Sequence, residues 1–296
     1  MAPPRPRLAV AVGDPRGIGP EVVRKALRQP LDADVRIVGG WEDGGGAAGK
    51  TPSDLEAGRA AAQNIEAAAR LALSGEADAI VTGPVNKLAL HGAGYRFPGV
   101  TEFLAHIAGD IPVAMMLTTG RLRVVLVTTH LSLRDAIAAV TTERVVQAGR
   151  IAIDALRQWW GITSPRLALC ALNPHAGEGG LFGDEDDRLL RPAASALDAA
   201  GPLPADTVFV RALRGEFDAV LAPYHDVGMT AVKVAGFGKG VNVTLGLPFP
   251  RTAPDHGTAF DIAGKGVADP SSMRAALDLA VELARSVVRR RSDATP

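Results

Sequence analysis

Residues 124–130 read VVLVTTH, residues 167–175 read LALCALNPH, and residues 219–225 read AVLAPYH. Each stretch begins with an uninterrupted apolar run whose length is typical of a strand, and each ends at a histidine. Continuous apolar runs, as opposed to alternating ones, are typical of parallel strands that helices cover on both faces. The three stretches therefore predict an α/β protein with several buried parallel strands.

Three histidines, His130, His175 and His225, share one placement at or just beyond the carboxyl end of a predicted strand. In open α/β sheets, ligands bind beyond those ends. Three imidazoles can hold one divalent metal ion and leave a coordination position for water or substrate. The alternative is three unrelated histidines, each hydrogen-bonded at its own strand end. The repeated placement favours a shared metal site.

Strand-like and helix-like segments alternate along the 296 residues, a length sufficient for two lobes. The alternation predicts a two-lobed α/β/α architecture with a mostly parallel sheet. No linker-like stretch separates the lobes, so we expect them to be discontinuous, with residues 1–100 and 240–296 in one lobe and residues 101–239 in the other. Besides the three runs above, strands are predicted over 8–12, 35–38, 77–82 and 241–245. Helices are predicted from about residue 21, from a start within residues 51–54 to about residue 73, and over 142–160, 191–199 and 271–289.

Charge and cysteine content exclude several classes of protein. Lys and Arg number 32, as do Asp and Glu, so no charge excess indicates binding to nucleic acid or to an anionic membrane. The single cysteine, Cys170, lies in an apolar strand and is interpreted as a core residue, not a nucleophile. No apolar stretch is long enough to span a bilayer. We expect a cytoplasmic protein without a signal peptide.

Three glycine-rich strings could approach a phosphate or another anion. Residues 44–51, GGGAAGKT, formally match a P-loop, but the preceding strand is predicted to end too early, so we interpret them as a flexible loop. Residues 13–21, GDPRGIGPE, join the first strand to the first helix, where glycines allow close ligand approach; an ordinary turn is the alternative. Residues 173–180, NPHAGEGG, permit a concave backbone around His175, with a hairpin loop as the alternative.

Residues 255–270, DHGTAFDIAGKGVADP, form the most specific string in the chain. They resemble the adenosine-binding loop of isopropylmalate and isocitrate dehydrogenases, which also carry an N-terminal string like GIGPE at residues 17–21. The resemblance implies that His256, Gly257 and Ala259 lie near an adenine and that Asp261 accepts the ribose hydroxyls. A carboxylate at that position repels a 2′-phosphate, which favours NAD over NADP.

Ordered motifs along nearly the whole chain resemble the 4-hydroxythreonine-4-phosphate dehydrogenase family of pyridoxal phosphate biosynthesis, a relative of those dehydrogenases. The matching motifs are residues 13–21, 82–87, 101–104, 128–131, 172–180, 201–207, 224–226, 242–248 and 251–264. The resemblance implies an isocitrate/isopropylmalate dehydrogenase-like fold and a homodimer with its active site at the subunit interface. It also implies that the lobe with both termini lies on the cofactor side, while residues 101–239 carry metal, substrate and dimer contacts.

The resemblance also implies the reaction, which is the NAD-dependent oxidation and decarboxylation of 4-phosphooxy-L-threonine to 3-amino-2-oxopropyl phosphate in vitamin B6 biosynthesis. A divalent metal, namely zinc, cobalt or magnesium, acts as a Lewis acid on the substrate hydroxyl, and a carboxylate or amine removes its proton. By position, the family's metal ligands match His130, His175 and His225, its substrate-binding residues match Thr101, Lys233, Asn242 and Arg251, and the candidate bases are Asp206 and Lys233.

Departures from the family pattern fall where substrate specificity can change. The family's histidine before Thr101 is Val100 here, its His-Met after Gly180 is Leu181-Phe182, and its Gln-Gly after Asp226 is Val227-Gly228. A second hypothesis therefore keeps the chemistry on another β-hydroxy acid, either a phosphorylated threonate or erythronate or an aromatic dicarboxylate cis-dihydrodiol. A metal-dependent hydrolase, an ATP-using P-loop enzyme and a non-catalytic binding protein are weaker alternatives, because each leaves part of the motif set without a role.

Overall fold

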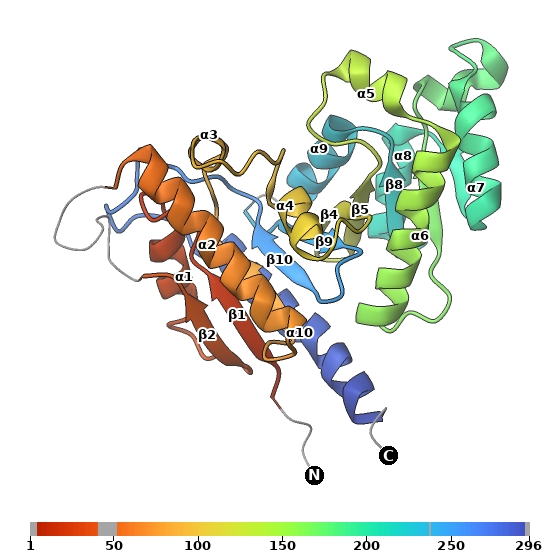
Figure 1. Ribbon diagram of the computed structural model, residues 1–296. Coiled ribbons are helices and arrows are strands. Elements are labelled where there is room, and N and C mark those ends of the chain that lie inside the picture. Colours follow the sequence, from red (N-terminus) through yellow and green to blue (C-terminus); the bar gives the residue numbers. More distant parts are fainter. Residues whose placement is uncertain (1–4, 41–51, 237, 294–296) are drawn as a thin grey trace. The chain divides into compact units, whose positions relative to one another are not determined.

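The computed structural model describes residues 5–40, 52–236 and 238–293 (Figure 1). The chain divides into two compact units: unit 1 comprises residues 1–111 with 241–296, and unit 2 comprises residues 112–240. The first boundary differs from the one expected after residue 100, because α4 (Val100–Ile107) packs against α2 (Asp54–Leu73) and so belongs to unit 1. The P-loop-like string at residues 44–51 lies outside the described residues.

Unit 1 contains five strands in the order β2–β1–β3–β10–β9. Neighbours along β2, β1, β3 and β10 are parallel, whereas β9 runs antiparallel to β10. Helix α2 packs on β1, β2 and β3, and α10 packs on β1, β3, β9 and β10. The strands are β1 (Arg7–Ala11), β2 (Asp34–Val38), β3 (Ala79–Thr82), β9 (Val241–Leu245) and β10 (Arg251–Pro254), and the other helices are α1 (Gly19–Ala26), α3 (Lys87–Gly92) and α10 (Ser271–Asp293).

Unit 2 also contains five strands, in the order β4–β5–β8–β6–β7. Only β4 and β5 pair in antiparallel fashion. A buried apolar cluster joins β5, β6 and β8 to helices α8 and α9. The strands are β4 (Ala114–Thr119), β5 (Leu122–Leu126), β6 (Leu167–Cys170), β7 (Ala200–Leu203) and β8 (Ala219–Ala222), and the helices include α5 (Leu133–Ala139), α6 (Thr142–Trp159), α7 (Arg191–Leu197), α8 (Ala205–Leu213) and α9 (His225–Gly236).

The three apolar runs that precede the histidines form neighbouring parallel strands, in the order β5–β8–β6. The predicted α/β fold with a mostly parallel sheet is therefore confirmed. Cys170 is fully buried in β6, and this burial raises the pKa of its thiol to about 12, which confirms it as a core residue. Among the described residues, no helix combines the length and the apolar character needed to cross a bilayer.

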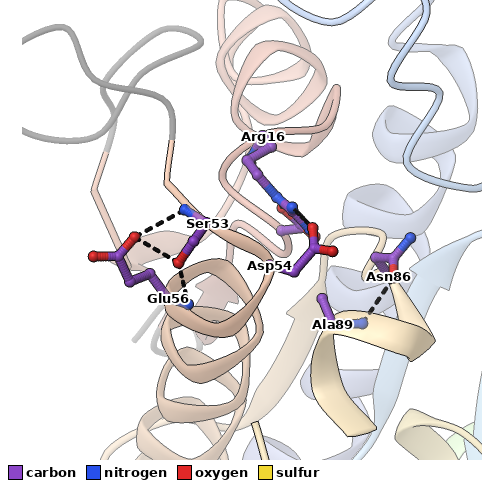
Figure 2. A network of polar contacts seen from close by, with 7 residues as sticks. Arg16, Ser53, Asp54, Glu56, Asn86 and Ala89 are labelled. Atoms are coloured by element: carbon purple, nitrogen blue, oxygen red, sulfur yellow. Dashed lines mark hydrogen bonds and ion pairs between the residues drawn. The ribbon is translucent and has the colours of Figure 1, made fainter. Parts of the chain in front are cut away.

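The start of α2 shows how local sequence fixes an element next to the first strand-to-helix turn (Figure 2). Ser53 is the N-cap: its hydroxyl accepts a hydrogen bond from the Glu56 amide, and the Glu56 carboxylate accepts one from the Ser53 amide at 2.8 Å. Arg16, from the turn after β1, forms ion pairs with Asp14 and with Asp54 in the first turn of α2. These contacts hold the glycine-rich turn at residues 13–21 against α2.

Candidate active-site residues

The paired strands β5 and β8 bring two of the predicted metal ligands together. Beyond the strand ends, the Val127 amide donates to the Ala222 carbonyl at 2.9 Å, and the Thr128 hydroxyl donates to the Pro223 carbonyl at 2.8 Å. These bonds extend the contact between the two segments to Thr128 and Pro223, and two residues farther along each segment the ring centroids of His130 and His225 lie 5.7 Å apart. Two imidazoles at this separation fit a common divalent ion.

His225 already has the second hydrogen bond that metal-binding histidines usually carry. Its Nδ1 lies 2.7 Å from Oδ1 of Asp226. Because the carboxylate accepts, the proton resides on Nδ1, and the lone pair of Nε2 is left for a ligand. The side chain of His225 is one-third exposed.

His175 follows β6, but the structure does not bring it into a group with the other two. Residues 175–179 all adopt left-handed backbone conformations, including His175 itself at φ 54°. Its ring lies 6.2 Å from the ring of Phe182, centroid to centroid. Within the described part of the chain, no three His, Cys, Asp or Glu side chains are arranged to hold one metal ion. The three-histidine site therefore stays a prediction, of which His130 and His225 form the assembled part.

The loop that carries His175 is anchored by a buried carboxylate. Asp186, which is fully buried, accepts hydrogen bonds from the amides of Leu172 at 2.8 Å and Asn173 at 3.0 Å. The Asn173 side chain in turn donates to Glu185 at 2.8 Å. These contacts stabilise a run of left-handed residues that non-glycine side chains disfavour. Neither acid was singled out in the sequence, because nothing in its local pattern links it to β6.

Both candidate general bases lie in unit 2. Asp206 is exposed in the first turn of α8 and lines a largely apolar groove of about 600 Å3 between α8 and α9. The same groove is lined by Tyr224 and by Asp226, the partner of His225. Lys233 is half-buried near the end of α9. Asp206 is therefore the candidate base that lines the same groove as Asp226, the hydrogen-bond partner of His225.

Arg251 is buried in unit 1 among threonine hydroxyls. Only 4% of this residue is exposed, and its Nε and Nη2 donate to the Thr82 hydroxyl at 3.1 and 2.6 Å. Its Nη1 donates to the Thr244 hydroxyl at 3.1 Å. Burial lowers the pKa of Arg251 to about 10, while the charge of Glu102 acts to raise it. The guanidinium is therefore still charged at neutral pH, and within the described residues its hydrogen bonds go only to hydroxyls.

Two more predicted substrate residues lie next to Arg251. The Thr101 hydroxyl is 3.2 Å from the Thr244 hydroxyl, and Asn242 shares a face of β9 with Thr244, two residues away. Oδ1 of Asn242 is buried and has no hydrogen-bond partner among the described residues. We call Thr82, Thr101, Asn242, Thr244 and Arg251 the Arg251 cluster. A buried cation suits a small anionic ligand, and the unpaired Asn242 oxygen suits a ligand group that donates a hydrogen bond, such as a hydroxyl.

The predicted cofactor loop packs against the glycine-rich turn after β1. The Ile18 amide donates to the Thr258 carbonyl at 2.9 Å, and a side chain at Gly17 would come within 2.8 Å of that oxygen, so only glycine fits. Arg16 lies over the Phe260 ring, 5.2 Å from its centroid. The two strings that suggested a dinucleotide site therefore lie side by side in unit 1.

Two residues of this loop, His256 and Asp261, carry groups that could hydrogen-bond to an adenosine ligand. Nε2 of His256 is buried with no hydrogen-bond partner within the described residues, while its Nδ1 lies 3.1 Å from the Gly257 carbonyl. Asp261 is exposed, so its carboxylate is accessible. Ala259 adopts a left-handed conformation at φ 42°, and Gly257 is exposed beside it. These residues fit a nucleotide, with a donor or acceptor nitrogen for the base and a carboxylate for ribose hydroxyls.

Comparison with known proteins identifies close relatives along most of the chain. The family profile of "Pyridoxal phosphate biosynthetic protein PdxA" matches residues 33–280. A 4-hydroxythreonine-4-phosphate dehydrogenase of Beijerinckia indica is 46% identical, over 93% of this chain and 94% of its own. A D-threonate 4-phosphate dehydrogenase of Salmonella typhimurium is 41% identical, over 94% of this chain and 98% of its own.

Solved structures agree with this relationship. The crystal structure of 4-hydroxythreonine-4-phosphate dehydrogenase from Klebsiella pneumoniae aligns with a TM-score of 0.83 at 38% identity, and covers 95% of this chain and all of that one. Isocitrate dehydrogenase from Methylococcus capsulatus aligns with a TM-score of 0.51 at 17% identity, over 97% of this chain and 89% of its own, which shows a shared fold only. The isocitrate dehydrogenase-like architecture expected from the sequence is thus confirmed.

Proposed function

Because the chain belongs to the PdxA family of pyridoxal phosphate biosynthetic proteins, we propose that it is an NAD-dependent and metal-dependent decarboxylating dehydrogenase of 4-phosphooxy-L-threonine. The observation that carries this proposal is the Arg251 cluster. Within the described residues, the hydrogen bonds of this buried guanidinium go to hydroxyls, and burial of such a charge is unfavourable unless an anion binds it. The substrate supplies such an anion twice, as a phosphate and as a carboxylate.

In this proposal, the residues of unit 1 bind and orient the substrate. Arg251 donates to a phosphate or carboxylate of the substrate, and a planar guanidinium can do so through two parallel hydrogen bonds. Thr101 and Asn242 offer a hydroxyl and an amide to the remaining oxygens. Lys233 is the remaining predicted substrate residue, and its ammonium group has the charge to bind an acidic group of the substrate.

The metal and the cofactor have their own candidate residues. His130 and His225, with His175 as third ligand, would hold a zinc, cobalt or magnesium ion, which when bound supplies Lewis acidity that lowers the pKa of the substrate hydroxyl. His256, Gly257, Ala259 and Asp261 would hold NAD, which when bound supplies the hydride acceptor. Asp206 or Lys233 takes the hydroxyl proton. We further propose that the enzyme is a homodimer whose active site lies at the subunit interface.

A second candidate function keeps the same residues and changes the substrate to D-threonate 4-phosphate. Two observations favour it: a D-threonate 4-phosphate dehydrogenase is 41% identical to this chain, and Val100 stands where the family pattern has a histidine. Val100 is the first residue of α4, directly before Thr101 of the Arg251 cluster. The two substrates differ at one position, where the amino acid carries an ammonium group and the sugar acid carries a hydroxyl.

The test is NADH formation by the metal-depleted protein before and after zinc, cobalt or magnesium is restored. 4-Phosphooxy-L-threonine and D-threonate 4-phosphate are supplied in parallel with NAD+. We expect metal-restored NADH production with the first substrate. Turnover of the sugar acid alone would replace it with the second function. No NADH with either substrate, or turnover that survives chelation, would contradict the proposal.

A further inference from the structure

Glu102 places a negative charge beside the Arg251 cluster without pairing to it. It lies in the first turn of α4, directly after Thr101, whose hydroxyl is 3.2 Å from that of Thr244. Thr244 accepts a hydrogen bond from Arg251 at 3.1 Å. Oε2 of Glu102 is buried and has no hydrogen-bond partner within the described residues. The charge of Glu102 acts to raise the pKa of Arg251, so the two charges lie near each other, but no ion pair or hydrogen bond joins their side chains within the described residues.

This arrangement is unfavourable in the protein by itself. A buried carboxylate oxygen that accepts no hydrogen bond forfeits its hydration without compensation, and the same holds for a buried guanidinium that lacks a counter-ion. If the two charges served only to neutralise each other, contact between them would be the better geometry. Two neighbouring but unpaired charges of opposite sign suit a third group that carries both signs of charge.

A small zwitterion satisfies both residues at once. Its anionic end would bind Arg251, and its ammonium group would donate to Glu102 in a charge-assisted hydrogen bond. An acid that carries a hydroxyl in place of the ammonium would satisfy Arg251 but would leave the Glu102 charge unpaired. The two residues together therefore discriminate between an amino acid and the corresponding hydroxy acid.

We propose that Glu102 is a specificity-determining residue that binds the ammonium group of a phosphorylated amino acid whose anionic end is held by Arg251. This inference rests on the proposed function in one respect, that the Arg251 cluster binds the phosphorylated substrate. It adds the side chain that selects 4-phosphooxy-L-threonine over D-threonate 4-phosphate, and it assigns Glu102 a ligand of defined chemistry.

The experiment measures binding and does not need turnover. O-phospho-L-serine and 3-phospho-L-glycerate differ only in an ammonium group against a hydroxyl, and each is titrated calorimetrically into the full-length protein. The variants are Glu102→Gln, which keeps the shape and removes the charge, and Glu102→Asp, which keeps the charge. Glu76→Gln is the matched control, because its side chain is exposed and paired with Arg36.

We expect wild-type protein and Glu76→Gln to bind phosphoserine about tenfold or more tightly than phosphoglycerate, as a charge-assisted hydrogen bond predicts. Glu102→Gln should bring the ratio of the two dissociation constants to about one by weakening phosphoserine alone. Glu102→Asp should keep part of the preference, and it tests the inference if the glutamine variant does not fold.

Three results would overturn the inference. The first is a wild-type ratio near one or no binding of phosphoserine. The second is an unchanged ratio in Glu102→Gln. The third is an equal loss for both ligands in that variant, which would mean that Glu102 only supports the charge of Arg251. The NADH assay is separate, so a failure of this inference and a failure of the proposed function are distinguishable.

Discussion

The Arg251 cluster of unit 1 and the histidine pair of unit 2 are built in opposite ways. Arg251 is buried, and strand pairing places it directly opposite Thr244 in the antiparallel ladder between β10 and β9. His130 is exposed, lies four residues beyond the end of β5 at Leu126, and has a left-handed backbone at φ 40°. The candidate anion-binding residues are therefore positioned by the sheet, whereas the predicted metal ligands lie in segments that follow strand ends.

The difference shows that a sheet determines the positions of side chains within its strands but not of those beyond the strand ends. Ladder hydrogen bonds define which side chains share a face, so β9 and β10 alone bring Thr244 and Arg251 together. Beyond the strand ends, one backbone hydrogen bond and one bond from the Thr128 hydroxyl join the segment before His130 to the segment before His225. His175 lies in a left-handed turn of its own, and within the described residues it is not grouped with the other two histidines.

The largest expected effect comes from Arg251→Met, which removes the charge and keeps most of the volume. Loss of a buried charged hydrogen-bonding group costs several kcal/mol of binding, so kcat/KM for 4-phosphooxy-L-threonine should fall by about a hundredfold or more. Stability should be unchanged or higher, because a buried guanidinium without a counter-ion is removed. Steady-state kinetics and thermal unfolding measure the two effects.

Arg251→Lys is the control for charge without the planar geometry, and it should lose activity while it keeps some substrate affinity. If Arg251→Met keeps its activity but loses several kcal/mol of stability, Arg251 is a structural residue. The Arg251 cluster would then not be a binding site, and the comparison with the histidine pair would be wrong.

An intermediate effect is expected from Asp226→Asn in unit 2. Asp226 orients His225 through the 2.7 Å contact with Nδ1, and loss of such a partner typically weakens metal affinity about tenfold or more. Competition with a chromogenic chelator for zinc measures this change. Asp184→Asn serves as the control, since Asp184 is an exposed acid of the same unit. If the zinc affinity of Asp226→Asn equals that of wild type, His225 is not positioned in this way.

The sequence alone predicted the three strands with the apolar runs that precede the histidines, but it missed β4, with the sequence AMMLTT, and β10. Strand β10, with the sequence RTAP, has no apolar run, yet it is buried because it lies between β3 and β9. Arg251 was identified only by family resemblance, since an arginine in an interior strand contradicts the usual pattern. Thr82 and Thr244 became apparent only through their contacts with Arg251. The pairing of His130 with His225 followed from strand placement, but the left-handed turn that carries His175 did not.

The smallest expected effect concerns how unit 1 holds the predicted cofactor loop. Glu21 is buried and accepts hydrogen bonds from the amides of Ala268 at 2.9 Å and Gly266 at 3.3 Å, and it forms an ion pair with Lys25 at 2.8 Å. Burial by itself acts to raise the pKa of Glu21, but the hydrogen bonds from Lys25 and the two amides outweigh it and leave the pKa below its ordinary value. Asp186 anchors the His175 loop of unit 2 by the same device, two backbone amides on one buried carboxylate.

Because the folded pKa of Glu21 is depressed, its carboxylate contributes stability above its unfolded pKa of about 4.3, and this contribution is lost as the pH falls through the lower folded value. Glu21→Gln should therefore lower the free energy of unfolding by about 1 kcal/mol at neutral pH, and the difference from wild type should shrink below about pH 4. Urea denaturation at several pH values measures it, with the exposed Glu76→Gln as the control. A difference that persists unchanged into acid would mean that the shape of Glu21, not its charge, holds the loop, and that the two units anchor their loops by different means.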